Sequence, residues 1–178
     1  MRVITGTARG RRLSELPGDK IRPTTDMIKE ALFNIVQFDI EGRNVLDLFA
    51  GSGQLGIEAL SRGAASVTFI DESPAAIKIV TKNLEHCKLT GKVIQDDALR
   101  FIMRSPVFDL ILIDPPYDSG LYVKILQKIN QFDILSIGGI IVCESQAEEE
   151  MPEMEKPYEK GREYRYGKVK LTVYKKDE

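Results

Sequence analysis

The sequence predicts an α/β protein with a doubly wound, mostly parallel sheet, and two observations support this prediction. Short apolar segments rich in branched residues alternate with segments of helical periodicity, which favours right-handed crossovers between parallel strands. The C-terminal segment instead alternates polar and apolar residues, as an antiparallel hairpin does. Together these patterns predict seven strands, the last two forming a C-terminal hairpin, behind a small basic N-terminal extension.

The expected elements begin with a helix in "RPTTDMIKEALFNIV", where Thr24, Thr25 and Asp26 offer N-caps after Pro23. Its predicted apolar stripe consists of Met27, Ile28, Ala31, Leu32, Ile35 and Val36. Strands are expected at residues 44–50, 66–71, 92–95, 108–114 and 139–144. The clearest helix follows the second of these, with Ser73 as N-cap, Pro74 at its first position, and Ile77, Val80 and Leu84 on one face.

Length and composition predict one compact unit. The chain has 178 residues, of which 43% are hydrophobic and 29% charged. We divide it into a basic extension over residues 1–40, which packs on the core, and a main domain over residues 41–178. No apolar run approaches the roughly 20 residues of a membrane span, and "MRVITGTARGRR" lacks the apolar core of a signal peptide. We therefore expect a cytoplasmic protein.

The residues that commonly bind metals or form disulfides are sparse. Cys87 and Cys143 lie far apart in the sequence, in a helical and a strand pattern, so they predict neither a disulfide framework nor a CxxC site. His86 is the single histidine, and no metal or triad partners are spaced near it. The sequence predicts no metal site.

Charge is distributed unevenly along the chain. The net charge is −2, yet residues 1–22 carry six Lys or Arg against two acids, and residues 156–176 carry eight against two. If the two basic ends met in space they would form a positive face for nucleic acid, whereas the alternative is ordinary solvated surface. In the first segment Arg9, Arg11, Arg12 and Arg22 are the candidate phosphate contacts.

The first strand leads into a glycine-rich motif, "DLFAGSGQLG". Gly51, Gly53 and Gly56 match G-x-G-x-x-G, and Asp71 follows about 20 residues later, as in dinucleotide-binding sites. A buried Asp47 just before the loop would repel a pyrophosphate, however, and suits a cationic cofactor. S-adenosylmethionine fits better, because it carries a sulfonium and an ammonium but no phosphate. A tight turn without ligand is the remaining alternative.

The fourth strand ends in "LILIDPPYDSG". In a doubly wound sheet the ends of the first and fourth strands flank the switch point, so Asp114, Pro115, Pro116 and Tyr117 are expected beside the glycine loop. Asp114 and the Pro115 carbonyl can accept hydrogen bonds from an exocyclic amine, and Tyr117 offers a stacking face for its base. An acidic turn after a strand is the alternative interpretation.

The combination of "DLFAGSG" and "DPPY" resembles the class I S-adenosylmethionine-dependent methyltransferases that modify exocyclic amines of nucleobases. The flanking segments "MRVITGTARGRRL", "RPTTDMIKEALFNIV", "LDLFAGSGQLGIEALSRGA" and "YGKVKLTVY" are similar to the bacterial 16S ribosomal RNA guanine-N2 methyltransferases called RsmD. The resemblance extends nearly from end to end. It implies a Rossmann-like methyltransferase sheet and methylation of N2 of guanine 966 in 16S rRNA. The expected partner is 16S rRNA within a small-subunit assembly particle, without an obligate protein partner, and the sequence leaves free RNA, a protein-bearing subunit and a mature particle open as the substrate.

The resemblance also implies site residues. The cofactor would be held by Asp47, Gly51, Gly53, Asp71, Asp97 and Ala98. The catalytic residues would be Asp114, Pro115, Pro116 and Tyr117. Two positions differ from the pattern: Met27 replaces a frequent Arg after "RPTTD", and Asp71 stands where some members have Glu.

Two other functions stay open on the sequence. A dinucleotide-dependent oxidoreductase would use the same glycines, but Asp47 and "DPPY" oppose it. A noncatalytic RNA-binding module would not depend on S-adenosylmethionine, and the intact Asp114 with both prolines opposes that. DNA adenine or cytosine methyltransferases share D-P-P-Y, so this motif alone does not select the base.

Overall fold

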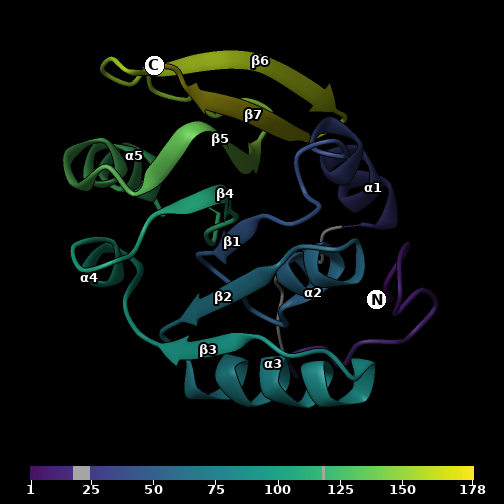
Figure 1. Cartoon of the computed structure of the whole chain (residues 1–178). Coiled ribbons are helices and arrows are strands. Elements are labelled where there is room, and N and C mark those ends of the chain that lie inside the picture. The colour runs from purple at the N-terminus through teal and green to yellow at the C-terminus, as the bar shows by residue number, and fades with distance from the viewer. Residues whose placement is uncertain (18–24, 118) are drawn as a thin grey trace.

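The structure, a computed structural model, describes residues 1–17, 25–117 and 119–178 (Figure 1). These residues form a seven-stranded sheet of order β3-β2-β1-β4-β5-β7-β6. Its strands are β1 (Asn44–Asp47), β2 (Ser66–Asp71), β3 (Lys92–Gln95), β4 (Phe108–Ile113), β5 (Leu135–Gln146), β6 (Tyr158–Tyr166) and β7 (Val169–Lys176). Strands β1 to β5 run parallel, and β7 lies antiparallel between β5 and β6. The predicted sheet and its C-terminal hairpin are confirmed.

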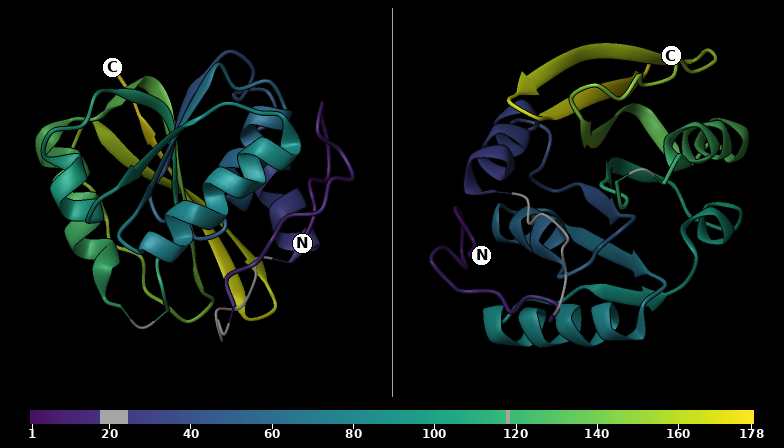
Figure 2. Two further views of the ribbon diagram at one scale, coloured as in Figure 1. Left: turned by 90° about the horizontal axis from the view of Figure 1, so that it is seen from below. Right: turned by 180° about the vertical axis from the view of Figure 1, so that it is seen from behind.

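Helices cover both faces of the sheet (Figure 2). The helices are α1 (Asp26–Ile35), α2 (Gln54–Ser61), α3 (Pro74–Cys87), α4 (Ala98–Ile102) and α5 (Leu121–Phe132). One apolar cluster holds side chains of α1, α2 and α3, and the other holds those of α4 and α5. The crossovers therefore change face after β3, and the switch point lies between β1 and β4, as predicted.

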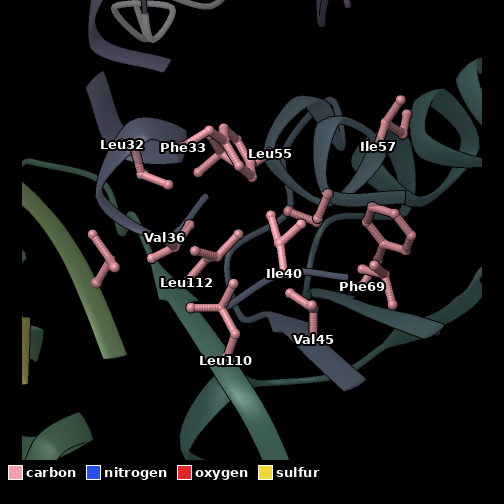
Figure 3. Close-up of a cluster of buried hydrophobic side chains, with 14 of the residues drawn as sticks. Leu32, Phe33, Val36, Ile40, Val45, Leu55, Ile57, Phe69, Leu110 and Leu112 are labelled. Carbon is pink, nitrogen blue, oxygen red and sulfur yellow. The ribbon is translucent and has the colours of Figure 1, made fainter. Parts of the chain in front are cut away.

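Alternation along each strand divides the apolar side chains between the two clusters. On β4, Leu110 and Leu112 belong to the first cluster and Ile111 and Ile113 to the second. Figure 3 shows the first cluster, where Leu112 lies beside α1 and α2 residues. Because both faces of the sheet are buried at β4, the sequence of this strand from Leu110 to Ile113 is a continuous apolar run and does not alternate between polar and apolar residues.

The structure confirms a predicted N-cap for each of two helices, α1 and α3. Thr25 caps α1 by accepting the N–H of Ile28, and Ser73 caps α3 by accepting the N–H of Ala76, with Pro74 in its first position. Of the other two candidate caps, Asp26 is the first residue of the helix, and Thr24 lies outside the described residues, as does Pro23 before it.

Some details of the predicted elements are wrong. Met27 is 62% exposed, whereas Phe33, which the predicted stripe omits, is fully buried. The reason is tertiary, because α1 turns a face centred on Leu32 and Phe33 toward α2 and the sheet. Strand β5 is longer than residues 139–144 at both ends, because Leu135 already pairs with Phe108 of β4, and Ser145 and Gln146 pair with β7. Strand β1 ends at Asp47, where the chain begins to turn toward α2.

The aromatic residues of the C-terminal hairpin pack against the protein core. Tyr164 and Tyr166 are partly buried and pack against the first cluster. The basic residues of this region are also engaged locally: Lys170 pairs with Glu163 and Lys176 with Asp133. Much of the positive charge counted in residues 156–176 is therefore balanced within the hairpin and its neighbours.

Candidate active site

The glycine loop, residues 48–53, joins β1 to α2 at the switch point. The N–H of Leu48 donates to the carbonyl of Leu112 at 3.1 Å, and that of Ala50 donates to the carbonyl of Ile70 at 2.9 Å. The start of the loop is thus tied to both neighbouring strands, β4 and β2. This places the loop beside the ends of the strands from which Asp114 and Asp71 come.

The three glycines of the motif serve three purposes. Gly51 has a φ of 56°, and a Cβ built there would meet nothing within 4 Å. Its backbone can therefore be approached closely by a ligand. Gly53, with a φ of 81°, is the N-cap of α2. A Cβ on Gly56 would lie 2.3 Å from the Phe69 ring, so this glycine allows α2 to pack tightly on β2.

Asp71 ends β2 and organises the loop from the side. Its Oδ2 accepts the N–H of Gly51 and its Oδ1 accepts the N–H of Ser73, both at 2.9 Å. The carboxylate is half-buried. A carboxylate oxygen has two lone pairs, so each can accept a further hydrogen bond from a ligand hydroxyl.

Asp47 ends β1 and is 1% exposed. Its Oδ2 accepts the N–H of Gly56 at 3.0 Å. That N–H belongs to the first turn of α2, whose donors would otherwise be available to a phosphate. The internal carboxylate thus occupies part of the anion-binding capacity of this helix end, which argues against a pyrophosphate cofactor.

The protonation of Asp47 depends on its burial. Burial raises the pKa of Asp47 to about 7, the Gly56 hydrogen bond opposes the rise, and the charge of Asp71 adds to it. Because the folded state then holds this proton more tightly than the unfolded chain does, the free energy of unfolding falls as pH rises from about 4 to about 7.

Replacing Asp47 by asparagine is expected to remove this part of the pH dependence. The variant keeps an acceptor for the Gly56 N–H but cannot ionise. It should therefore avoid the loss of about 3 kcal/mol in the free energy of unfolding that this titration causes in the unaltered protein between pH 5 and pH 8. The measurement is urea unfolding of both proteins at pH 5 and pH 8. Equal pH dependence of the two proteins would contradict the buried titration of Asp47.

The end of β3 contributes a pair of acidic residues. The N–H of Asp96 donates to the carbonyl of Asp71, which holds the ends of β3 and β2 together. Asp97 is exposed and caps α4 by accepting the N–H of Arg100, and the following Ala98 is buried at the start of that helix. Asp97 and Ala98 therefore lie at the strand end adjacent to Asp71.

Asp96, which sequence reasoning passed over, has a structural role instead. It is 3% exposed and receives ion pairs from Arg100 and Arg104. Burial favours its neutral form, but the Arg100 hydrogen bond and the two positive charges prevail and lower the pKa of Asp96.

The D-P-P-Y segment directly follows β4. Asp114 and Tyr117 are half-buried, Pro115 is buried and Pro116 is exposed. Both prolines lack an N–H, so the segment leaves the sheet at once, and their fixed φ stiffens the turn. Because β4 pairs with β1, this turn and the glycine loop emerge from adjacent strands. The fold thus brings the two motifs together, as the sequence predicts.

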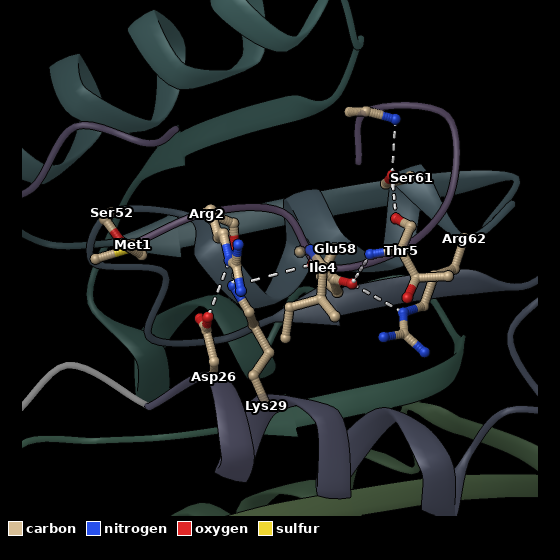
Figure 4. Close-up of polar contacts among 12 residues, drawn as sticks. Met1, Arg2, Ile4, Thr5, Asp26, Lys29, Ser52, Glu58, Ser61 and Arg62 are labelled. Carbon is tan, nitrogen blue, oxygen red and sulfur yellow. Dashed lines mark hydrogen bonds and ion pairs between the residues drawn. The ribbon is translucent and has the colours of Figure 1, made fainter. Parts of the chain in front are cut away.

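The basic extension begins with an N-terminal arm, residues 1–17, that packs along α2 and α3 (Figure 4). Its tip lies at the C-terminal end of α2, where the N–H of Ala8 donates to Ser61 Oγ. Its base lies by the glycine loop, where Ser52 Oγ contacts Met1 Sδ at 3.3 Å. Because α2 starts at that loop, the tip is roughly 12 Å farther along the helix than the base.

The arm arginines have different environments. Arg9 and Arg12 are exposed. Arg11 is half-buried and donates from Nη1 to the carbonyl of His86 at the end of α3. Arg2 pairs with Asp26 at 3.1 Å. Arg22 lies outside the described residues. A pocket of about 150 Å³ in the arm is lined by Arg2, Val3, Ile4, Arg9 and Gly10.

Sequence reasoning missed a buried ionic cluster beneath the arm. Glu58 of α2 is fully buried and accepts the N–H groups of Ile4 and Thr5 at 2.9 and 3.0 Å. It also pairs with Arg62 at 2.9 Å and lies 3.9 Å from the buried Lys29 of α1. The sequence contains one signal for this cluster, which is that the charged residue Glu58 lies on an otherwise apolar face of its helix.

No group of three or more His, Cys, Asp or Glu side chains in residues 1–17, 25–117 and 119–178 is arranged to hold a metal ion. Over the same part of the chain, no helix is both long and apolar enough to cross a membrane.

Comparisons with known proteins agree with the fold and motifs. The family model described as conserved hypothetical protein 95 matches residues 1–175. A Bacillus subtilis protein named "Putative rRNA methyltransferase YlbH" is 40% identical, with 99% of each chain covered. Ribosomal RNA small subunit methyltransferase D of Escherichia coli is 33% identical, covering 99% of this chain and 90% of that one.

Solved structures give the same result. The structure titled "Putative methyltransferase yhhF from Escherichia coli" superposes with a TM-score of 0.89 at 34% identity, covering 99% of this chain and 98% of that one. The chain therefore belongs to the conserved hypothetical protein 95 family, which is the RsmD family of methyltransferases that the sequence resembles.

Proposed function

We propose that this protein transfers a methyl group from S-adenosylmethionine to the N2 amine of guanine 966 in 16S ribosomal RNA. The single observation that carries the proposal is the D-P-P-Y turn beside the glycine loop at the switch point, in a chain whose relatives are named for methylation of small-subunit rRNA. A substrate within a small-subunit assembly particle is part of the proposal.

The residues around the glycine loop fit the cofactor. Gly51 leaves open space, Asp71 keeps lone pairs for the ribose hydroxyls, and Asp97 lies at the next strand end for the adenine. Asp47 places a titratable carboxyl group behind the loop, where a positive charge nearby would favour its ionised form. When bound, S-adenosylmethionine supplies a methyl group activated by the positive charge on sulfur.

The D-P-P-Y residues would position the amine. An exocyclic amine is a poor nucleophile because its lone pair is delocalised into the ring. Asp114 and the Pro115 carbonyl accept its two N–H groups and so orient the nitrogen toward the methyl group, while Tyr117 stacks on the base. The nitrogen becomes strongly acidic as the new N–C bond forms, so its proton leaves late, to Asp114 or water.

The direct test is transfer of labelled methyl from S-adenosylmethionine to naked 16S RNA and to 30S subunits lacking the modification, followed by mapping of the labelled nucleoside. We expect N2-methylguanosine at position 966, with more transfer to particles than to naked RNA. Label in adenosine or cytidine, or transfer that requires no RNA, would contradict the proposal.

The exposed arm arginines are expected to contact RNA phosphates. Replacing Arg9 and Arg12 together by alanine should weaken RNA binding and reduce the slope of log K against log salt by about 0.7 to 0.9 per lost contact. Filter binding at several salt concentrations measures this slope. Lys78→Ala, which changes an exposed residue of α3, is the control. An unchanged slope in the double variant would remove these arginines from the RNA interface.

A further inference from the structure

A buried asparagine connects three segments near the proposed cofactor site. Asn83 of α3 is 1% exposed. Its Oδ1 accepts the N–H of Ser14 at 2.8 Å, and its Nδ2 donates to the Ser14 carbonyl at 3.0 Å. The same Nδ2 donates to the carbonyl of Ser52 at 2.8 Å. One side chain therefore joins α3, the N-terminal arm and the glycine loop.

These three hydrogen bonds use both N–H groups of the Asn83 side chain and its amide oxygen. The amide nitrogen has two N–H groups, one for each carbonyl, and the oxygen accepts the arm's N–H. Asn83 lies on the buried stripe of α3, between Val80 and Leu84, where an apolar residue would pack as well but would leave three backbone groups without this partner. Leaving partly buried backbone groups unsatisfied is costly, so packing alone does not explain an asparagine here.

The position of Ser52 gives this contact a functional meaning. Ser52 stands between Gly51, whose backbone is open to a ligand, and Gly53, which caps α2. Both glycines have positive φ, a region that glycine enters and leaves at little cost, so the loop needs external contacts to hold one conformation. Asn83 holds the peptide between them from behind, and Met1 contacts Ser52 Oγ from the arm.

We propose that Asn83 is a positioning residue that couples the N-terminal arm to the glycine loop. Docking of the arm fixes Ser14 on Asn83, Asn83 fixes Ser52, and the loop is thereby held ready for S-adenosylmethionine. The coupling is reciprocal, so cofactor binding also tightens the arm, which carries the proposed RNA-contacting arginines. The inference rests on the proposed function only in placing the cofactor at the glycine loop.

The first test is calorimetric binding of S-adenosylhomocysteine to the full chain. Asn83→Ala is expected to weaken binding about tenfold. Asn83→Asp should weaken it at least as much, because it retains the Ser14 acceptor but presents a carboxylate to two carbonyl oxygens. Lys82→Ala, on the exposed face of the same helix, should leave it unchanged. Thermal melting of each variant is recorded in parallel. A lower melting temperature with unaltered affinity, measured well below melting, would reduce Asn83 to a structural residue and overturn the proposal.

The second test uses the unaltered protein, so it does not depend on how the variants fold. Amide hydrogen exchange is measured with and without S-adenosylhomocysteine. The proposal expects slower exchange at the Ser14 N–H, which bonds Asn83 from the arm, together with slower exchange in the glycine loop. Protection confined to the loop would overturn it. Failure of the unaltered protein to bind S-adenosylhomocysteine would instead contradict the proposed cofactor site, which keeps the two hypotheses distinguishable.

Discussion

Replacing Asp114 by alanine is expected to slow methyl transfer by roughly 100-fold or more, the cost typical of removing one preorganised hydrogen bond from a transition state. Asparagine should give an intermediate rate, because it retains one acceptor oxygen but lacks the charge. Affinity for S-adenosylhomocysteine should change far less, since Asp114 lies on the amine side of the proposed site. The measurement is single-turnover transfer to 30S subunits at saturating cofactor.

Tyr117 provides the matched comparison on the same turn. Tyr117→Phe keeps the stacking face and should keep most of the activity, whereas Tyr117→Ala should lose about tenfold or more. These variants separate stacking from hydroxyl chemistry. A wild-type rate for Asp114→Ala would show that the D-P-P-Y turn does not orient the amine, whatever Tyr117 does.

Replacing Glu58 by alanine is expected to lower the free energy of unfolding by about 3 to 5 kcal/mol, the usual cost of breaking a buried ion pair from one side. Glu58 is fully buried, and its loss would leave the N–H groups of Ile4 and Thr5 without their acceptor. It would also remove the partner of Lys29, whose pKa burial already lowers despite the nearby Glu58 charge.

Urea unfolding measures the loss, and limited proteolysis reports release of the arm. Glu30→Ala, which removes an exposed carboxylate from α1, is the control and should change stability by less than about 0.5 kcal/mol. If Glu58→Ala were as stable as Glu30→Ala, the buried cluster would not hold the arm in place.

The sequence by itself determined the alternation of strands and helices, the switch point and the two motifs that meet there. It could do so because these features are local. A buried parallel strand needs a run such as "LILI", a helix start needs Ser73 followed by Pro74, and a loop with positive φ at Gly51 and Gly53 needs glycine. Because right-handed crossovers that change face reverse the direction in which strands are added, the ends of β1 and β4 are neighbours at the switch point.

Only the tertiary structure decided how the N-terminal arm and the buried polar residues are used. In sequence, Arg11 looks like Arg9 and Arg12, but it reaches the carbonyl of His86, which is 75 positions away. Glu58 and Asn83 appear as ordinary polar residues of helices, yet their partners on the arm, Ile4, Thr5 and Ser14, lie 53 to 69 positions away. Hydrogen bonds over such separations depend on how α1, α2 and α3 pack, and no local pattern encodes that packing. The two motifs were therefore predictable from the sequence, whereas the long-range contacts of Arg11, Glu58 and Asn83 were not.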